Sequence, residues 1–272
     1  MTMGHRDRDQ DRDQDRDRDR DRVAEVIAEE TQGAGPREVP QRLCDAVLKL
    51  LPVSGASMSL RGDGMPVPLS ASGEQAAYVM ELQVTLGDGP CLEAAETGSV
   101  VSATDLMSSR DASRWPVFAQ QAAALGVRSV YALPLGDRTV CVGTLDLYRD
   151  VPGELAAGEV RTAWVVAETV TEALVALPRA EWNDPDGPDG PDGPDDLDDL
   201  DDLDDVGRWL SPLAIDHDDV YRAVGMVMAQ LGVAADEALS LLRGHAFAKS
   251  RTVLELAHEV VALRTRFDDP SP

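Results

Sequence analysis

The chain has 272 residues, 43% of them hydrophobic, and a formal net charge of −25, which leaves room for two domains with charged tails. It has no apolar run long enough to cross a bilayer and no basic start followed by an apolar region. The sequence therefore predicts a cytoplasmic protein with no membrane segment. Three widely spaced cysteines, Cys44, Cys91 and Cys141, argue against a disulfide framework or a zinc site.

The first segment, residues 1–37, is dominated by alternating Arg and Asp. From Arg6 to Arg22, seven Arg face eight Asp and no residue is apolar, so this stretch has nothing to bury. It is predicted to be a disordered tail, or at most a charged helix. Because each Arg has an acidic neighbour, the segment is not predicted to be a nucleic-acid-binding arm.

Residues 38–178 alternate helical and strand patterns and are predicted to form one domain. A first helix, an antiparallel sheet with helical excursions and a closing helix make the fold class α+β, with the architecture of a sensor domain. The expected elements are a helix over 39–51, strands over 56–60 and 65–71 around a turn at 61–64, a helix over 74–86, a short strand over 98–103, a helix over 114–125, strands over 129–135 and 140–148 around a tight turn at 136–138, and a helix over 155–177.

An acidic linker, residues 179–212, follows this domain. Its PDG and DDL repeats place twelve Asp within residues 183–205, which repel one another and cannot form a core. The main interpretation is a spacer; a second is an acidic strand that occupies a basic patch of the same chain. Calcium binding is disfavoured because the repeat lacks the later Glu and the ligand alternation of an EF-hand loop.

Residues 213–267 are predicted to form a bundle of three short helices. Apolar residues spaced by three and four mark the buried stripe of the first helix, which Gly232 ends. Asp236 and Glu237 suit the first turn of the second helix, and Thr252 with Glu255 forms a capping box at the start of the third. The stripes are formed by Val220, Val224, Val227, Met228 and Leu231, then Ala238, Leu239, Leu241, Leu242 and Ala246, then Val253, Leu256, Ala257, Val260 and Val261.

This region resembles the ANTAR domain, a helical module of transcription antiterminators. The resemblance is carried by Ala223-x-Gly225-Met226-Val227-Met228, by Asp236-Glu237-Ala238 with Leu242-Arg243, and by Ala257 with Val260-Val261. It implies a regulator that binds a structured RNA stem-loop, as a homodimer, and favours antitermination. The RNA-binding residues that it implies, together with the local basic cluster, are Arg222, Ala223, Gly225, Arg243, Lys249 and Arg251.

Charge leaves two hypotheses open for this bundle. Between residues 213 and 267, six basic residues face seven acidic ones, although RNA affinity depends strongly on Lys and Arg contacts to phosphates. The family commonly has Lys at the positions of Val224 and Thr252. The alternative is therefore an interaction or dimerisation module whose bundle no longer binds RNA, with its basic residues serving helix C-termini and solubility. A third hypothesis is a sensor that acts on a partner kinase or phosphatase.

The preceding domain is similar to GAF domains, which come before ANTAR domains in actinobacterial proteins. The similarity is carried by residues 86–92, 114–118 and 126–135. It implies a module that dimerises, or that holds a small molecule between its sheet and the overlying helices; no ligand or cofactor is indicated. Cys91 is a weak candidate for a reactive thiol at a helix start, and otherwise a buried apolar residue. The chain has no P-loop, GxSxG, Rossmann or HExxH motif, so no enzymatic activity is expected.

Overall fold

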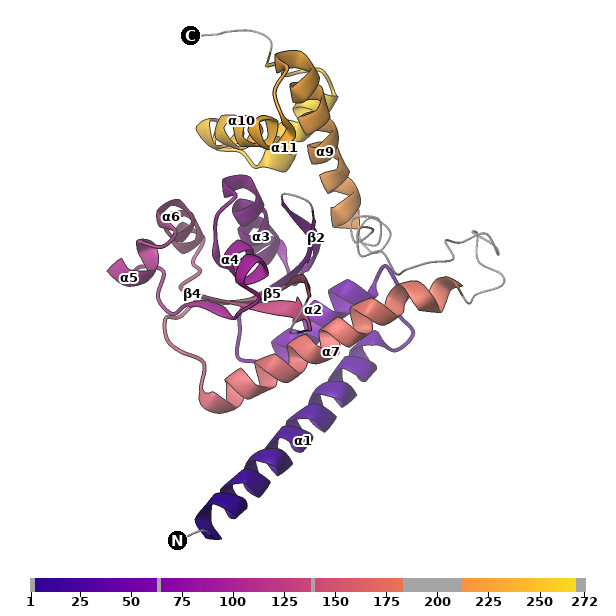
Figure 1. Cartoon of the computed structure of the whole chain (residues 1–272), viewed down its shortest axis with the longest axis vertical. Helices are drawn as coiled ribbons and strands as arrows, with labels where there is room; N and C mark the ends of the chain where they lie inside the picture. Colours follow the sequence, from indigo (N-terminus) through magenta and orange to yellow (C-terminus); the bar gives the residue numbers. More distant parts are fainter. Residues whose placement is uncertain (1–2, 63–64, 138–139, 183–211, 268–272) are drawn as a thin grey trace.

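The computed structural model of the protein describes residues 3–62, 65–137, 140–182 and 212–267. Figure 1 shows an N-terminal domain around one sheet and, at the end of the molecule opposite the N-terminus, a C-terminal helical bundle. The elements in chain order are α1 (Met3–Thr31), α2 (Val39–Leu50), β1 (Gly55–Arg61), β2 (Pro66–Ala71), α3 (Glu74–Leu86), α4 (Pro90–Thr97), β3 (Val101–Ala103), α5 (Ser109–Ala112), α6 (Pro116–Ala124), β4 (Ser129–Gly136), β5 (Cys141–Arg149), α7 (Ala157–Trp182), α9 (Pro212–Leu231), α10 (Ala235–Ala248) and α11 (Val253–Val261).

The sheet has five strands in the order β2-β1-β5-β4-β3, and every neighbouring pair is antiparallel. The two hairpins predicted from the sequence are β1–β2 and β4–β5. The central strand β5 lies between β1 and β4, and its register pairs Leu145 with Met58 on one side and with Leu133 on the other. The α+β fold class predicted from the alternating patterns is confirmed.

Alternate residues of each strand face two separate cores, as the period of two in a strand requires. On one face, Leu145 and Leu147 of β5 pack with α2 and α7. On the other face, Tyr148 packs among residues of α3, α4 and α6, including Phe118. The central strand β5 is therefore covered by helices on both faces, and its polar side chains on the second face are buried.

Helix α1 contains the Arg/Asp segment. Of the two states that the sequence allowed, disorder or a charged helix, the structure has the helix. Its C-terminal part buries Val23 and Ile27 against the α2 and α7 core. Further towards the N-terminus, Arg16 and Arg20 pair with Glu168 of α7 at 3.4 and 3.6 Å. These ion pairs are exposed and contribute little to stability, so the apolar contacts hold this helix in place.

Two local features differ from the sequence prediction. The helix predicted over 114–125 is present as α6, which begins at Pro116 after Trp115, but a further short helix before it, α5, was not predicted. Ser108 caps α5, and its hydroxyl accepts from Asp111 N at 3.2 Å. The short strand starts at Val101, because residues 90–97 form α4 and Gly98 ends it in the left-handed conformation. The acidic repeat at 183–205 lies outside the described residues.

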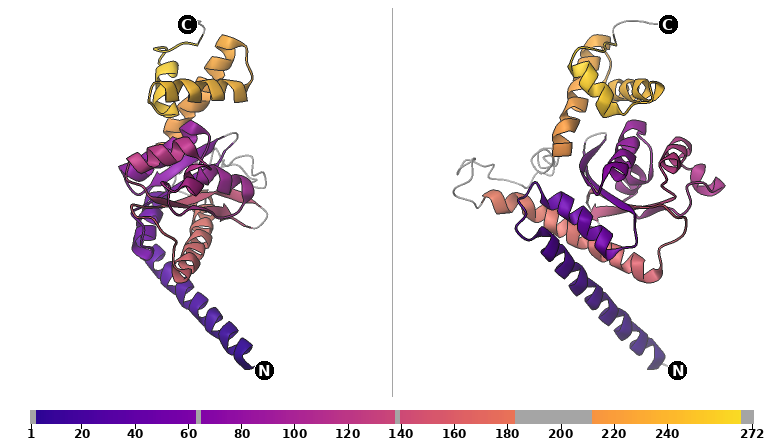
Figure 2. Two further views of the ribbon diagram at one scale, coloured as in Figure 1. Left: turned by 90° about the vertical axis from the view of Figure 1, so that its left-hand side faces the viewer. Right: turned by 180° about the vertical axis from the view of Figure 1, so that it is seen from behind.

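The C-terminal bundle consists of α9, α10 and α11, arranged beside the end of α3 (Figures 1 and 2). Gly232 ends α9 with φ of +69°, as its position predicted. Within the described residues, no single helix is long and apolar enough to cross a membrane; a bent pair, His217–Leu231 with Ala235–Ala248, passes on length and composition together.

Candidate functional site

The core of the C-terminal bundle is built from most of the predicted apolar stripes; Leu231 and Leu241, which were assigned to them, are exposed. Val220, Ala223 and Val227 of α9 are fully buried against α10 and α11. The capping box at the start of α11 is present: Thr252 Oγ1 accepts from Glu255 N at 3.1 Å, and Glu255 Oε2 accepts from Thr252 N at 3.0 Å. The partners in α10 and α11 that are also fully buried are Ala238, Leu242, Ala246, Val253, Leu256, Ala257 and Val260.

The predicted RNA-binding residues do not form one surface. Ala223 is fully buried in the bundle, where it has a packing role. Gly225 is exposed on α9, with open space where a side chain would lie. On the same helix, the Arg222 side chain is exposed and its Nη1 donates to Asp219 Oδ1 at 3.0 Å. Lys249 and Arg251 lie together on the exposed turn between α10 and α11.

The α10–α11 turn carries a basic charge that is partly compensated. Arg251 Nη1 donates to Glu259 Oε1 of α11, and this hydrogen bond, with one from Thr265, holds the pKa of Glu259 below its usual range. Lys249 is exposed beside them. The turn is tight, with Ser250 at φ of +54°, a conformation that L-residues rarely adopt. A phosphate approaching this turn meets two cations and one carboxylate.

The bundle is docked on the C-terminal end of α3. The first backbone N–H groups of a helix have no partner within the helix; in α11 the N-terminal domain supplies the acceptors. Val253 N donates to Thr85 Oγ1 at 2.8 Å, and Leu254 N donates to Glu81 Oε1 at 3.4 Å. The Glu81 carboxylate also complements the positive end of the helix dipole, and its Oε2 lies 2.8 Å from His217 Nε2 of α9.

Apolar packing completes this interface. Met65 and Val84 of the N-terminal domain are 4% and 1% exposed because they belong to the hydrophobic core of the C-terminal bundle. Thr85 is likewise buried. The C-terminal bundle thus supplies backbone donors, the N-terminal domain supplies their acceptors, and both domains contribute apolar side chains to the interface. Nothing in the local sequence indicated it, because the partners are about 170 residues apart.

Arg243, predicted to bind RNA, lies inside this interface. Its Nε donates to the carbonyl oxygen of Val84 at 3.0 Å, and burial lowers the pKa of its guanidinium. Its Nη2 atom has no hydrogen-bond partner within the described part of the chain. A side chain at Gly87 would meet Arg243 Nη1 at 2.6 Å. In the docked arrangement, this guanidinium is half-buried and is engaged by the N-terminal domain.

A buried polar network lies between the sheet and α3. Gln83 Nε2 donates to Asp146 Oδ2 at 2.9 Å, and Tyr148 OH donates to the same oxygen at 3.3 Å. Ser57 Oγ lies 2.7 Å from Tyr148 OH. Desolvation raises the pKa of Asp146 from 3.8 to about 7, and its Oδ1 has no partner among the described residues. The sequence indication was a single Asp on an otherwise apolar central strand.

Cys91 belongs to the same network and is not activated. Its backbone N donates to Gln83 Oε1 at 2.8 Å, and its side chain is 2% exposed. Burial raises the pKa of the Cys91 thiol well above its usual value, and the charge of Asp146 raises it further. Hydrogen bonds from backbone N–H groups at the helix start lower the pKa of this thiol, as expected there, but burial outweighs them. Among the described residues, no cluster of His, Cys, Asp or Glu is placed to hold a metal ion.

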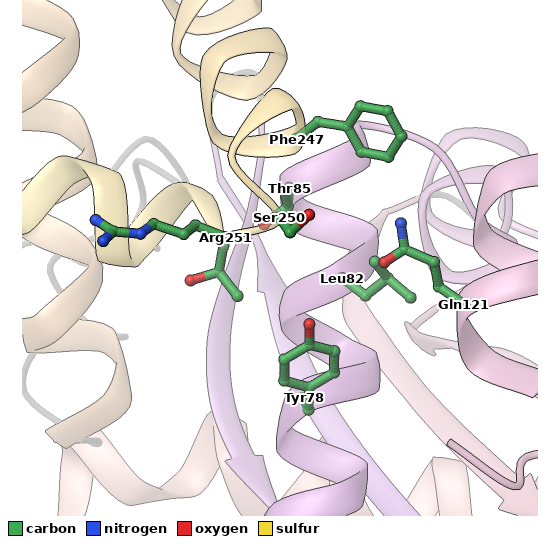
Figure 3. A pocket seen from close by; sticks show the side chains of 8 residues that line it. Tyr78, Leu82, Thr85, Gln121, Phe247, Ser250 and Arg251 are labelled. Carbon is green, nitrogen blue, oxygen red and sulfur yellow. The ribbon is translucent and has the colours of Figure 1, made fainter. Parts of the chain in front are cut away.

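A cavity of about 230 Å³ opens at the seam between the two domains. Its walls come from α3, α6 and the α10–α11 turn, as Figure 3 shows. Tyr78 and Phe247 are 42% and 48% exposed there. The complete lining is Tyr78, Leu82, Thr85, Gln121, Phe247, Ser250, Arg251 and Thr252.

Two family models match the chain. The GAF domain model matches residues 33–175, and the ANTAR domain model matches residues 216–261. No curated protein sequence matches the chain at a significant level.

Solved structures with a similar fold share little sequence with this chain. The GAF domain of an Acinetobacter phosphoenolpyruvate-protein phosphotransferase has 11% identity and a TM-score of 0.47, covering 59% of this chain and 95% of that one. The corresponding GAF domain from Coxiella burnetii has 16% identity and a TM-score of 0.43, covering 58% and 95%. Free methionine-R-sulfoxide reductase from Neisseria meningitidis has 14% identity and a TM-score of 0.43, covering 58% and 89%. These likenesses concern fold alone.

Proposed function

We propose that this chain, which belongs to the GAF domain family and carries a C-terminal ANTAR domain, is an RNA-binding antitermination regulator. In this proposal, the GAF domain controls the access of RNA to the ANTAR domain. ANTAR domains are RNA-binding modules of antitermination regulators, and GAF domains are sensory modules. The finer proposal concerns this chain's own residues: a structured stem-loop contacts the α10–α11 turn through Lys249 and Arg251, and the exposed face of α9 through Arg222 and Gly225.

One observation carries this proposal: the α10–α11 turn presents two cations to solvent while the domain is docked. Lys249 and Arg251 are both exposed. Arg251 pairs with Glu259, whereas Lys249 has no carboxylate partner in the part of the chain that the structure describes. Single-stranded loops offer phosphates and splayed bases to such a turn. The two positions at which the family commonly has Lys have structural roles here: Thr252 caps α11 within the same turn, and Val224 packs against the bundle core.

The docked arrangement supports a role for the GAF domain in control. Arg243 is bound to Val84 in this arrangement, so a state with separated domains presents one more cation to RNA. A signal that changes the stability of docking then changes RNA affinity by shifting the populations of the two states. The alternative function is a protein-interaction module without RNA binding. The contact between the two domains is also consistent with it, because the start of α11 already binds a protein surface, that of the GAF domain.

The charge of the turn is tested by removing it. The double variant Lys249→Ala, Arg251→Ala is expected to bind a paired stem-loop RNA more weakly than the wild type in fluorescence anisotropy across a salt series. Each lost phosphate contact reduces the slope of log K against log salt by about 0.9, so the slope is expected to fall by roughly 2.

The matched control removes two exposed Arg from the GAF domain, Arg42→Ala and Arg110→Ala, and keeps the same net charge as the test variant. It is expected to keep the wild-type slope. Salt-dependent binding with equal slopes in both double variants would place the RNA site away from the α10–α11 turn. No salt-dependent binding by the wild type would leave the interaction-module function as the better account.

We also propose that the protein is a homodimer through α7. This helix exposes Val160, Trp164 and Val175, with exposed fractions of 41%, 42% and 49%, and their spacing places them along one side of the helix. Trp164→Glu is expected to sediment as a monomer in analytical ultracentrifugation at concentrations where the wild type is a dimer. Met107→Glu, at an apolar residue exposed elsewhere, is the control. A dimeric Trp164→Glu variant, or a monomeric wild type, contradicts this proposal.

A further inference from the structure

The place where the GAF resemblance implies a ligand is filled by the protein's own side chains. Between the sheet and α3, Gln83, Asp146 and Tyr148 are at most 2% exposed and hydrogen-bond to one another. Cys91 packs into the same space. A ligand entering here has to break this network. The cavity at the domain seam, in contrast, is open in the docked arrangement.

The seam cavity has the size of a small ring compound. Its volume of about 230 Å³ lies below the roughly 300–1,000 Å³ of sites for drug-sized ligands. Nucleotides with a sugar and phosphates are therefore disfavoured by size. The residues that build it are contributed by both domains: Tyr78 and Gln121 by the GAF domain, and Phe247 and Ser250 by the ANTAR domain.

The polar groups of this cavity suit a flat heterocycle. In Figure 3, Tyr78 and Phe247 stand at opposite ends of the opening, and the Gln121 amide and the Ser250 hydroxyl lie between them. Aromatic side chains offer stacking faces to a planar ring. A Gln amide presents one donor and one acceptor side by side, the pair that binds the edge of a purine bidentately.

The charges around the cavity disfavour an anionic ligand. The Arg251 guanidinium points away from the cavity in Figure 3 and is engaged by Glu259. The other side chains that line the cavity are uncharged. A phosphate or carboxylate bound here would be desolvated without a cation facing it, which is unfavourable.

We propose that the seam cavity binds a free, neutral purine base and that the bound base holds the ANTAR domain against the GAF domain. The base stacks at Tyr78 and Phe247, and its edge pairs with the Gln121 amide. Because the walls separate when the domains separate, the ligand binds the docked state and stabilises it. The site itself is independent of RNA, whereas the consequence for RNA rests on the proposed function: docking withholds Arg243, so the base lowers RNA affinity.

The site is tested by isothermal titration calorimetry of the full-length protein with adenine and with guanine, in the absence of RNA. One of the two bases is expected to bind the wild type with 1:1 stoichiometry. Gln121→Leu removes both hydrogen bonds at nearly constant volume and is expected to weaken binding by about tenfold or more. Phe247→Ala is expected to weaken it as well. Gln32→Leu, at an exposed glutamine outside the cavity, is expected to leave it unchanged.

Two results overturn the site: no binding of either base with Kd below about 1 mM, or binding that Gln121→Leu and Phe247→Ala leave intact. Circular dichroism of each variant confirms that a loss of binding is not a loss of fold. The coupling is tested separately, by RNA titrations with and without the base. An unchanged RNA affinity in saturating base overturns the coupling and leaves the site standing, and a protein that binds the base and no RNA overturns the proposed function alone.

Discussion

Replacing Asp146 by Asn is expected to remove a decrease in the stability of the GAF domain that the wild type shows as the pH rises from about 4 to about 7. Burial raises the pKa of Asp146 from 3.8 to about 7 in the folded protein, so the folded state binds this proton more tightly than the unfolded state. The stabilisation is fully present below about pH 4 and is lost as the pH rises through about 7. The difference between the two pKa values corresponds to about 4 kcal/mol. Because Asn cannot ionise, the stability of Asp146→Asn does not show this decrease with rising pH.

The measurement is chemical denaturation of the wild type and Asp146→Asn at a series of pH values from about 5 to about 8.5. The free energy of unfolding of the wild type is expected to fall relative to that of the variant as the pH rises. Asp150→Asn, an exposed carboxylate directly after β5, is the matched control and is expected to follow the wild type. Parallel curves for the wild type and Asp146→Asn would mean that Asp146 does not change its protonation state on folding in this range.

Replacing Val84 by Glu is expected to separate the two domains. Val84 is 1% exposed only because the ANTAR bundle covers it, and a charge buried there without a partner costs several kcal/mol. In the separated state, this residue faces water at the end of α3, and the GAF core is unaffected. The backbone amides of Val253 and Leu254 then lose their acceptors, Thr85 and Glu81.

Hydrogen exchange of the full-length protein measures this separation. The amides of Val253 and Leu254 are expected to exchange faster in Val84→Glu, while amides in the central strand β5 keep their protection. Val151→Glu makes the same chemical change at a valine that is 47% exposed and is expected to exchange like the wild type. Unchanged protection at the start of α11 in Val84→Glu would show that docking does not depend on this contact.

Patterns within single elements predicted the secondary structure well. The two apolar strand segments and the turn between them predicted the β4–β5 hairpin, and the Thr252–Glu255 pair predicted the start of α11. Such patterns depend on neighbours within a few residues. The start of α6 at Trp115 and Pro116 agrees with the helix predicted over 114–125. The four-residue helix α5 was missed because it has no apolar periodicity and depends on the cap that Ser108 provides.

The candidate site depended on contacts between distant segments, and the sequence did not contain them in a recognisable form. Arg243 next to other basic residues indicated an RNA surface, but its place is set by Val84 and Gly87 of another domain. Cys91 at a helix start indicated a low thiol pKa, but Asp146 and burial reverse the direction. In both cases, the sequence identified the type of side chain and its local position. Residues from another part of the fold determine whether that side chain is accessible or ionised.

The RNA affinity of Val84→Glu, compared with that of the wild type under the same salt conditions, tests whether the GAF domain withholds Arg243 from RNA. Val84→Glu is expected to bind a paired stem-loop RNA more tightly, with a salt slope larger by about 1. This gain is expected to disappear when Arg243→Ala is added. Hydrogen exchange first establishes that the domains are separated in Val84→Glu. Equal RNA affinity and an equal salt slope in the wild type and this variant would then mean that docking does not withhold Arg243 from RNA.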